Sequence, residues 1–308
     1  MHIAVVGAGA VGGYYGARLA QSGERVTLVA RGAHLKAIRE RGLQIWSPLG
    51  DILVRVEADS EPERVGPVDL VILAVKTYSN RDALPRLPAL CGAETVVLTL
   101  QNGVDSAGEI ADAVGEARVL AGTTYVATAI AAPGVIQQTG THRRVIFGEA
   151  FGPRSVVSSR VSTIAGVLGR ADIQVEAVAN GMIPVWEKLV YLATFAAFTG
   201  AARKPAGAIW SDPEGREAFL AVAAEVEAVA RAEGVAIAAD VIPRMIAYLD
   251  ALPPSTRSSL LIDLQQGKPT EVEALQGAVV RRGRARGVPT PGMSSLYAAL
   301  RAANAVGE

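Results

Sequence analysis

The chain has 308 residues, carries 30 Lys and Arg against 30 Asp and Glu, and contains one cysteine. A chain of this length is expected to form two domains, each with its own core. The balanced charge offers no basic surface for nucleic acid. One cysteine and three histidines exclude a disulfide framework, a multi-cysteine zinc site, an iron–sulfur cluster and a His-rich metal site. We therefore expect no metal.

The chain opens on an apolar, strand-like run with no charged segment before it, so no signal peptide is expected. The most apolar later stretch, Leu189 to Ala202, is too short to span a bilayer and follows Glu187 and Lys188. These features predict a soluble, cytoplasmic protein that does not bind membranes.

The first half alternates short β-branched runs with segments of helical pattern. The runs expected to form strands are Ile3–Val6, Val26–Val29, Leu70–Val75, Val96–Leu100 and Val119–Ala121. The helical segments between them are Ala10–Ser22, His34–Arg41, Arg81–Pro88 and Ser106–Ala113. This alternation is typical of a parallel sheet with crossover helices.

The pattern then changes. Ala132-Pro133-Gly134 is a turn signal between two expected antiparallel strands, the second of which ends at Val145–Gly148. One more helix is predicted over Ser155–Gly169 and one more edge strand over Ile173–Val175. We place this α/β domain at residues 1–178.

From about Asn180 the chain is Ala-rich and has apolar residues at helical spacing. The predicted helices are Trp186–Phe198, Asp212–Glu233, Ala239–Ala251, Glu271–Arg286 and Gly292–Ala303. Turn signals that contain Gly or Pro separate them. We place this helical domain at residues 179–308.

Gly7-Ala8-Gly9-Ala10-Val11-Gly12 directly follows the first predicted strand and begins the first predicted helix. Gly7 allows a tight turn, Gly9 lets backbone amides approach a pyrophosphate, and Gly12 permits close packing of helix on strand. The alternative is a plain glycine-rich turn in a chain with 32 glycines. At the first strand–helix junction of an alternating domain, the motif predicts a dinucleotide site.

The end of the second strand bears on the choice between NAD and NADP. NAD-dependent dehydrogenases usually carry an acid there, which bonds the ribose 2′-hydroxyl. Here the strand runs into Ala30-Arg31-Gly32, and Arg31 can pair with a 2′-phosphate. The alternative is a solvated surface arginine, but the pattern favours NADP(H).

Other candidates follow strands or lie in the helical half. Lys76 and Asn102 come at the carboxyl ends of predicted parallel strands, where open α/β sheets bind ligands, although Asn-Gly is also a common turn. Lys188, just before an apolar run, is either a snorkelling side chain or a desolvated functional amine. Thr270 could cap the helix that follows, with Glu271 in its first turn.

A cluster of arginines lies near the end of the predicted helix Glu271–Arg286 and is interpreted as a solvated helix face: Arg281, Arg282, Arg284 and Arg286. Tyr14 and Tyr15 are expected to be packing residues. No Ser–His–Asp or Cys–His arrangement is present, which leaves Lys188 as the best candidate proton donor.

Taken together, these segments resemble the ketopantoate reductase family over essentially the whole chain. The residues that carry the resemblance are Gly7–Gly12, Ala30-Arg31-Gly32, Lys76, Gln101-Asn102-Gly103, Trp186-Glu187-Lys188-Leu189, Ser258-Ser259 to Asp263, and Thr270-Glu271. The resemblance implies an α/β fold: a Rossmann domain joined to an all-helical domain like that of 6-phosphogluconate dehydrogenase. It also implies reduction of a 2-oxo acid by NADPH, in the pathway to pantothenate.

The resemblance further implies roles for single residues. Lys188 matches the proton donor, Asn102 a contact to both the nicotinamide ribose and the substrate, and Ser259 a substrate contact. Glu271 matches a contact to cofactor and substrate that also anchors the surroundings of the lysine, and Ala127 a backbone contact to the cofactor. Lys76 is assigned to the cofactor site.

Several positions depart from the family pattern. Family members commonly carry asparagine where this chain has Leu192, Ala196, Ala206 and Thr256. Loss of these amides predicts a substrate that is bulkier or less polar than ketopantoate. Two other functions stay open: a non-catalytic NADP-binding sensor, and another hydroxy-acid or imine reductase of the same architecture. The Ala-rich helices could also support a homodimer.

Overall fold

The computed structural model, which describes residues 1–153 and 155–305, divides into two compact units. The first holds Met1–Gln101 and Ser106–Met182; the second holds Asn102–Asp105 and the chain from Ile183 onward. This division falls four residues later than the predicted boundary of 178/179. The reason is that the last strand, β10 (Gln174–Asn180), pairs with the sheet of the first unit. Inclusion of Asn102–Asp105 in the second unit was not anticipated.

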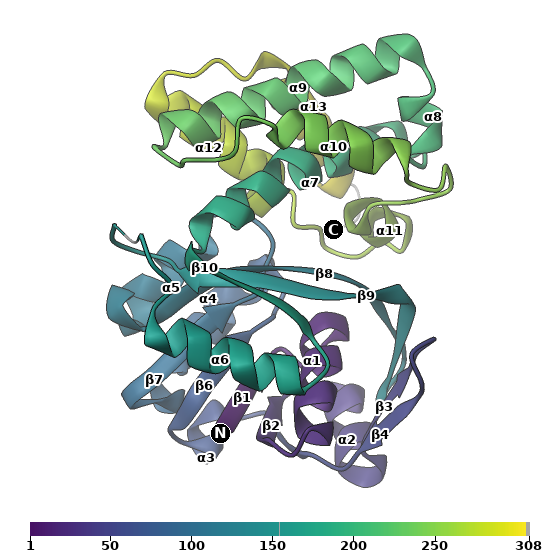
Figure 1. The fold of residues 1–308 in the computed structure, drawn as a ribbon. Coiled ribbons are helices and arrows are strands. Elements are labelled where there is room, and N and C mark those ends of the chain that lie inside the picture. Colours follow the sequence, from purple (N-terminus) through teal and green to yellow (C-terminus); the bar gives the residue numbers. More distant parts are fainter. Residues whose placement is uncertain (154, 306–308) are drawn as a thin grey trace. The chain divides into compact units, whose positions relative to one another are not determined.

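A ten-stranded sheet forms the centre of the first unit, in the order β4-β3-β9-β8-β7-β6-β1-β2-β5, with β10 beside β9 (Figure 1). Its strands are β1 (His2–Val6), β2 (Arg25–Val29), β3 (Leu43–Trp46), β4 (Ile52–Val54), β5 (Glu57–Asp59), β6 (Val68–Leu73), β7 (Cys91–Thr99), β8 (Val119–Ala132), β9 (Val135–Glu149) and β10. The pairs among β1, β2, β6, β7 and β8 are parallel, as predicted. The predicted turn at Pro133-Gly134 joins β8 and β9 as an antiparallel hairpin.

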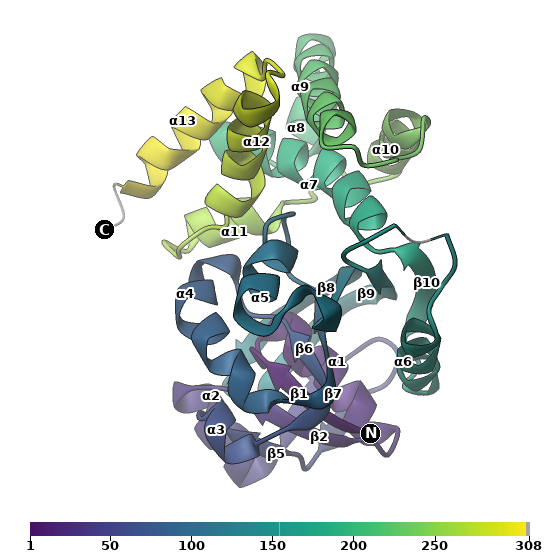
Figure 2. The same cartoon turned by 90° about the vertical axis from the view of Figure 1, so that its left-hand side faces the viewer.

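Short helices connect these strands. They are α1 (Ala10–Gln21), α2 (Gly32–Arg41), α3 (Pro62–Val65), η1 (Thr77–Ser79), α4 (Asn80–Ala83), η2 (Leu84–Leu90), α5 (Ser106–Val114), η3 (Glu116–Arg118) and α6 (Ser159–Arg170). Figure 2 shows α4 and α5 on one face of the central strands and α6 on the opposite face. The predicted packing role of Tyr14 and Tyr15 is confirmed, because both side chains are fully buried.

Helix α1 packs against the sheet and contacts β2, β3, β4, β8 and β9. A Cβ atom at Gly13 would lie 2.4 Å from Ile136 Cδ1, and one at Gly16 would lie 2.7 Å from Leu28 Cδ2. Glycines on the buried face of α1 therefore let strands from both ends of the sheet surround the helix. This packing fixes the N-terminus of α1 at the glycine loop.

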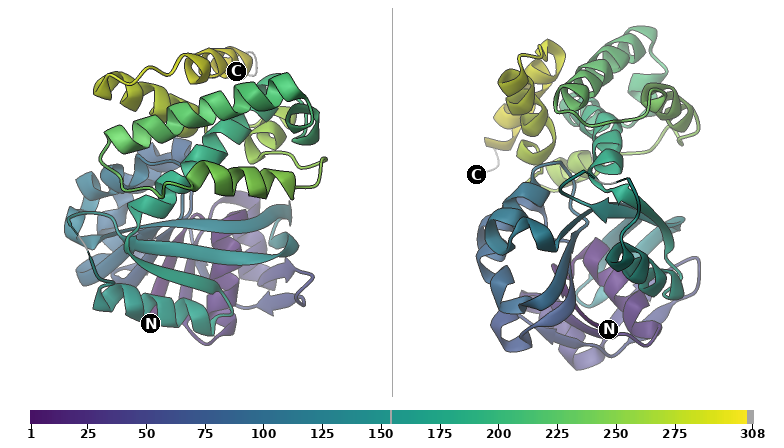
Figure 3. Two further views of the ribbon diagram at one scale, coloured as in Figure 1. Left: turned by 45° about the horizontal axis from the view of Figure 1, so that its top comes forward. Right: turned by 60° about the vertical axis from the view of Figure 1, so that its left-hand side comes forward.

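The second unit is helical, so the predicted α/β-plus-helical class is confirmed. Its elements are α7 (Met182–Ala202), α8 (Gly207–Trp210), α9 (Pro213–Ala232), α10 (Val241–Asp250), α11 (Ser259–Gln265), η4 (Glu273–Gly277), α12 (Ala278–Arg286) and α13 (Pro291–Ala305). Helix α9 packs against α12 and α13 (green and yellow, Figure 3). Among the described residues no helix is both long and apolar enough to cross a membrane.

The predicted helix over residues 271–286 begins differently from expectation. Its first turn is the π-helix η4, in which the Gly277 amide donates to the Val272 carbonyl at 2.9 Å. The residue that flanks this turn on its N-terminal side is Val272, and Thr270 lies two residues before it and is buried. Single π turns inside helices occur frequently at functional sites. Glu271 therefore lies two residues before an irregular turn and not on a regular helix.

Candidate active site

The glycine loop is fixed to the end of β2. The amides of Gly7 and Ala8 both donate to the carbonyl of Val29, at 3.2 and 3.1 Å. Gly7 has φ +94°, and a Cβ there would lie 2.6 Å from the Val75 nitrogen. A Cβ at Gly9 would meet nothing within 4 Å, and α1 begins without a side-chain cap. The loop thus presents backbone amides at the start of a helix to open space, which suits an anion.

An open pocket of about 260 Å³ lies against this loop in the first unit. Gly7–Gly9, Arg31, His34 and Arg86 line it. Arg86 is already paired with Glu61 and Glu63, whereas the exposed Arg31 forms no ion pair with any described residue. No Asp or Glu belongs to the described lining of the pocket. The pocket can therefore take an anionic ligand.

His34 was not singled out from the sequence. Its Nδ1 accepts a hydrogen bond from the Gly134 amide at 3.0 Å, so the neutral ring carries its proton on Nε2. Burial lowers the pKa of His34, and an interaction with the Ala8 backbone opposes this shift. The buried Nε2 forms no full hydrogen bond with a described residue, so a ring donor beside the anion-binding loop is the signal that the structure adds. In the sequence, the only hint is its place three residues after Arg31.

The other residues predicted for the cofactor lie outside this pocket. Gly12 is a packing residue, because a Cβ there would lie 2.2 Å from the Gly7 carbonyl oxygen. Ala10 and Val11 form the first turn of α1. Lys76 precedes η1, and its carbonyl accepts from the Ser79 amide at 2.8 Å. Ala127 is exposed in the β8–β9 hairpin.

Three predicted residues come together in the second unit. Lys188 Nζ donates to Asn102 Oδ1 at 3.2 Å, and Asn102 Nδ2 donates to Glu271 Oε2 at 3.2 Å. Glu271 is buried. Burial lowers the pKa of Lys188 to about 8, although the nearby Glu271 carboxylate opposes the shift. Lys188 and Glu271 lie 86 and 169 positions after Asn102 in the sequence, and the three residues form one polar cluster.

The predicted Ser258-Ser259 pair divides into two roles. Ser258 is buried and caps α11, because its Oγ accepts from the Leu261 amide at 3.1 Å and lies 2.7 Å from Thr199 Oγ1. Ser259 is exposed at the first position of α11. Only Ser259 of the pair is therefore available to a ligand.

The positions where asparagine was expected carry mostly apolar side chains, and two of them are buried. Ala196 is fully buried and Ala206 nearly so, while Leu192 is half-buried on α7. The Ala206 amide donates to the carbonyl of Thr256 at 2.8 Å. This part of the second unit thus offers a ligand fewer polar side chains than the family pattern would.

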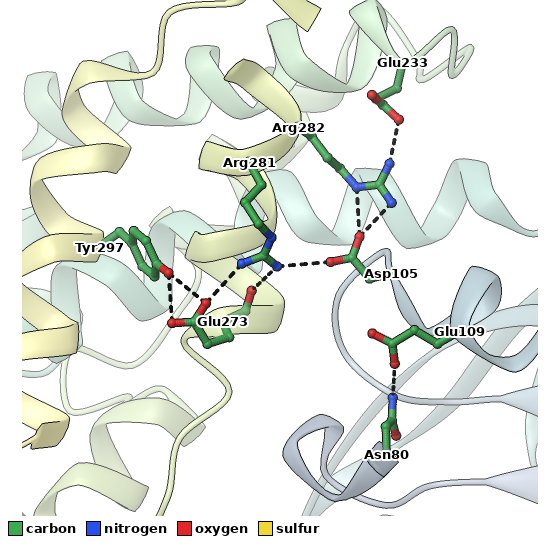
Figure 4. Close-up of polar contacts among 8 residues, drawn as sticks. All are labelled: Asn80, Asp105, Glu109, Glu233, Glu273, Arg281, Arg282 and Tyr297. Atoms are coloured by element: carbon green, nitrogen blue, oxygen red, sulfur yellow. Dashed lines mark hydrogen bonds and ion pairs between the residues drawn. The ribbon is translucent and has the colours of Figure 1, made fainter. Parts of the chain in front are cut away.

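The interpretation of the arginine cluster as a solvated face agrees with the exposed Arg281, Arg284 and Arg286, but Arg282 is half-buried and tightly paired. Arg282 donates to Asp105 Oδ1 through Nε at 2.9 Å and Nη2 at 2.6 Å, and Arg281 Nη2 lies 3.3 Å from Asp105 Oδ2 (Figure 4). Arg282 also bonds Glu233 at 2.6 Å. The acceptors lie far away in the sequence, so helical charge patterning could not reveal them.

Comparison with known proteins agrees with this geometry. Residues 3–152 match the family model "Ketopantoate reductase PanE/ApbA", and residues 182–304 match its C-terminal counterpart. A 2-dehydropantoate 2-reductase of Halobacterium salinarum is 33% identical over 98% of this chain and 99% of its own. A solved PanE/ApbA family ketopantoate reductase from Ralstonia eutropha is 33% identical, with a TM-score of 0.90 over 100% of this chain and 99% of that one.

A solved D-mandelate dehydrogenase with NADH and anilino(oxo)acetate has the same fold, with a TM-score of 0.90 over 100% of this chain and 99% of its own. Its identity is 24%. The two family models together cover most of the chain, and the relatives match it from end to end. The chain therefore belongs to the ketopantoate reductase family and is an oxidoreductase that acts on a CH–OH group.

Proposed function

We propose that the protein reduces a 2-oxo acid to the 2-hydroxy acid with NADPH, and that Lys188 is the proton donor. In this proposal residues 1–178 bind the cofactor and residues 179–308 supply the catalytic groups and much of the substrate site. The contact of Lys188 with Asn102, and of Asn102 with Glu271, is the observation that carries the proposal. A buried amine held by an amide beside a carboxylate matches the needs of proton transfer.

The residues of the glycine loop fit a nicotinamide dinucleotide. The Gly9 backbone and the uncapped start of α1 would hold the pyrophosphate, while the Gly7 and Ala8 amides fix the loop to Val29. Arg31 would pair with the 2′-phosphate of NADPH, and the Nε2 proton of His34 is a further donor to an anion. When bound, NADPH supplies a hydride. Lys76, Asn102, Ala127 and Glu271 are proposed as additional cofactor contacts.

Lys188 would act on the keto group of the substrate. Reduction places negative charge on the keto oxygen, and an ammonium group in a partly desolvated site stabilises this charge and then gives up a proton. Its pKa of about 8 leaves Lys188 mostly protonated at neutral pH, yet a better proton donor than an exposed lysine. Asn102 fixes the position of Nζ, and Glu271 balances its charge. Asn102, Lys188 and Ser259 are the proposed substrate contacts.

We propose further that the substrate is less polar than ketopantoate. Leu192, Ala196 and Ala206 replace expected amides, and a hydroxyl that lost those partners would be left unpaired in the site. The fold tolerates an apolar substituent in another protein, because the solved D-mandelate dehydrogenase contains anilino(oxo)acetate. A 2-oxo acid with an apolar side chain is thus the expected substrate class.

A panel of 2-oxo acids tests both proposals. NADPH oxidation is measured with ketopantoate, a branched aliphatic 2-oxo acid and an aryl 2-oxo acid, and each product is identified. We expect the apolar acids to show the higher kcat/KM and to yield 2-hydroxy acids. Ketopantoate as clearly the best substrate would contradict the apolar assignment, and no oxidation with any acid would favour the sensor function. An amine product would point to an imine reductase.

A further inference from the structure

The segment Asn102–Asp105 links β7 to α5 but packs within the helical unit. Its first residue, Asn102, bonds Lys188 and Glu271, and these three residues form the proposed catalytic cluster. Its last residue, Asp105, lies in the ion-pair network of α12. The segment thus connects Asn102 of the catalytic cluster to the ion pairs that Asp105 forms with the arginines of α12.

Asp105 is bound by two arginines from consecutive positions of α12. Arg282 contacts one carboxylate oxygen through two nitrogens, and Arg281 contacts the other oxygen (Figure 4). Arg281 also donates to the Glu273 carboxylate at 3.0 Å and to the Glu273 carbonyl at 2.9 Å. Isolated surface pairs contribute little, but a network with multiple hydrogen bonds to one carboxylate restricts its position.

The middle of the segment is fixed by packing. Gly103 has φ +89°, and a Cβ there would lie 2.6 Å from the Ala274 carbonyl oxygen. The side chain of Val104 is buried. The segment therefore contacts residues 271–274 along its length: Asn102 at Glu271, Gly103 at Ala274, and Asp105 through Arg281 at Glu273.

The chain is also fixed immediately before the segment. Gln101 Nε2 donates to Asn80 Oδ1 at 2.7 Å and to the Val75 carbonyl at 2.9 Å. Asn80 in turn donates to Glu109 at 2.6 Å (Figure 4). Arg282 also lies near the helix that carries Lys188, because its guanidinium carbon is 5.8 Å from the ring centroid of Trp186, two residues before Lys188.

We propose that Asp105 and Arg282 are positioning residues, which hold Asn102 in contact with Lys188 and Glu271. This inference rests on the proposed function for its effect on turnover, but the placement of Lys188 can be measured without turnover. When the Asp105–Arg282 contact is broken, the segment loses its C-terminal attachment and water reaches the Lys188 amine. Asn102 then no longer fixes Nζ.

The test compares Arg282→Gln with Arg286→Gln. Arg286 lies on the same helix and bonds the same Glu233 at 2.7 Å, but it has no contact with Asp105, so it is a matched control. The first readout is the pH dependence of acetylation of Lys188 by acetic anhydride, followed by peptide mass spectrometry. We expect the Lys188 pKa to stay near 8 in the unchanged protein and in Arg286→Gln, and to rise toward 10.5 in Arg282→Gln.

The second readout is turnover with the best 2-oxo acid of the panel. In Arg282→Gln we expect kcat to fall by about tenfold to a hundredfold, as for a small misplacement of a reacting group. The KM for NADPH stays unchanged, and Arg282→Lys recovers part of the loss. Circular dichroism checks the fold, and Asp105→Asn replaces Arg282→Gln if that variant does not fold.

An unaltered Lys188 pKa and kcat in Arg282→Gln or Asp105→Asn would overturn the inference. Equal losses in Arg282→Gln and Arg286→Gln would overturn it too, because they would show a general effect of charge removal. If the unchanged protein reduces no 2-oxo acid, the proposed function fails, while the labelling result still decides the positioning role.

Discussion

Lys188 was the residue with two open interpretations, a snorkelling side chain or a functional amine. The structure shows a desolvated amine that contacts Asn102 and whose pKa burial lowers to about 8, and its role as proton donor is our proposal. Spacing in the sequence could locate Lys188 before an apolar run but could not show this contact. The partner residue Asn102 comes from a segment 86 positions earlier.

Removal of the Lys188 amine should abolish proton donation without loss of cofactor binding. For Lys188→Ala we expect kcat to fall by about 10²–10⁴. NADPH binding, measured by fluorescence, should be unchanged because the glycine loop and Arg31 lie in the other unit. Lys204→Ala removes an exposed lysine from the same unit and is the control. Turnover by Lys188→Ala close to that of the control would reject Lys188 as the proton donor.

Arg31 should determine the preference between NADPH and NADH. Because a charge-assisted contact to the 2′-phosphate contributes about 1.5–3 kcal/mol, Arg31→Ala should raise the KM for NADPH by about tenfold to a hundredfold. The KM for NADH should barely change. Lys36→Ala, a charge-matched change on α2, the helix that follows Arg31, lies outside the pocket and is the control. Equal effects of Arg31→Ala on both cofactors would contradict the assignment.

At the scale of elements, the β1–loop–α1 junction is the best predicted part of the chain. Local signals sufficed there, because the strand, the glycines and the helix are consecutive in sequence. Strands β3, β4 and β5 escaped prediction because they are only three or four residues long, and β5 is largely polar as well. Helix α11 was missed for a similar reason, since its seven residues lie between turn signals.

Gly7 and Gly23 allow a matched test of the glycine loop. Both have φ +94°, so alanine is strained equally at either position. Only at Gly7 would the added Cβ also clash, at 2.6 Å from the Val75 nitrogen; at Gly23 it meets nothing within 4 Å. We expect Gly7→Ala to weaken NADPH binding at least tenfold.

Gly23→Ala should lower the free energy of unfolding by about 1 kcal/mol and leave NADPH binding intact. Calorimetric titration and thermal unfolding separate the two effects. Unchanged NADPH affinity in a folded Gly7→Ala variant would argue against pyrophosphate binding at this loop.

For the molecule as a whole, the change in sequence pattern near residue 180 predicts the two domains. It does not predict that a short segment of the first half of the chain belongs to the helical unit. Asn102–Asp105 belongs to the helical unit because Asp105 contacts residues 176 and 177 positions later. Contacts of this range depend on the folded backbone and leave no local pattern. For the same reason, Arg281 and Arg282 looked like ordinary surface charges.

The buried amine should also lower the stability of the whole fold. The Lys188 pKa is about 8 in the folded protein and near 10.5 in the unfolded chain, so the unfolded chain binds more protons between these values. Stability therefore rises as pH increases through this window, and below pH 8 the full penalty, up to about 3 kcal/mol, is present.

Lys188→Met should accordingly be more stable than the unchanged protein at pH 7, and its advantage should shrink between pH 8 and 10.5. Denaturant unfolding at several pH values measures this difference, with Lys204→Met as the control for loss of a lysine. A difference in stability between the two proteins that does not change between pH 8 and 10.5 would show that Lys188 is not desolvated in solution.

The most direct measurement is the rate of 2-hydroxy acid formation from an apolar 2-oxo acid and NADPH, followed between pH 6 and 10. If protonated Lys188 is the donor, one hydroxy acid forms for each NADPH consumed at neutral pH. The rate then falls about tenfold for each pH unit above about 8, where the amine loses its proton. Absence of the hydroxy acid, or a rate that stays constant up to pH 10, would contradict reduction by this mechanism.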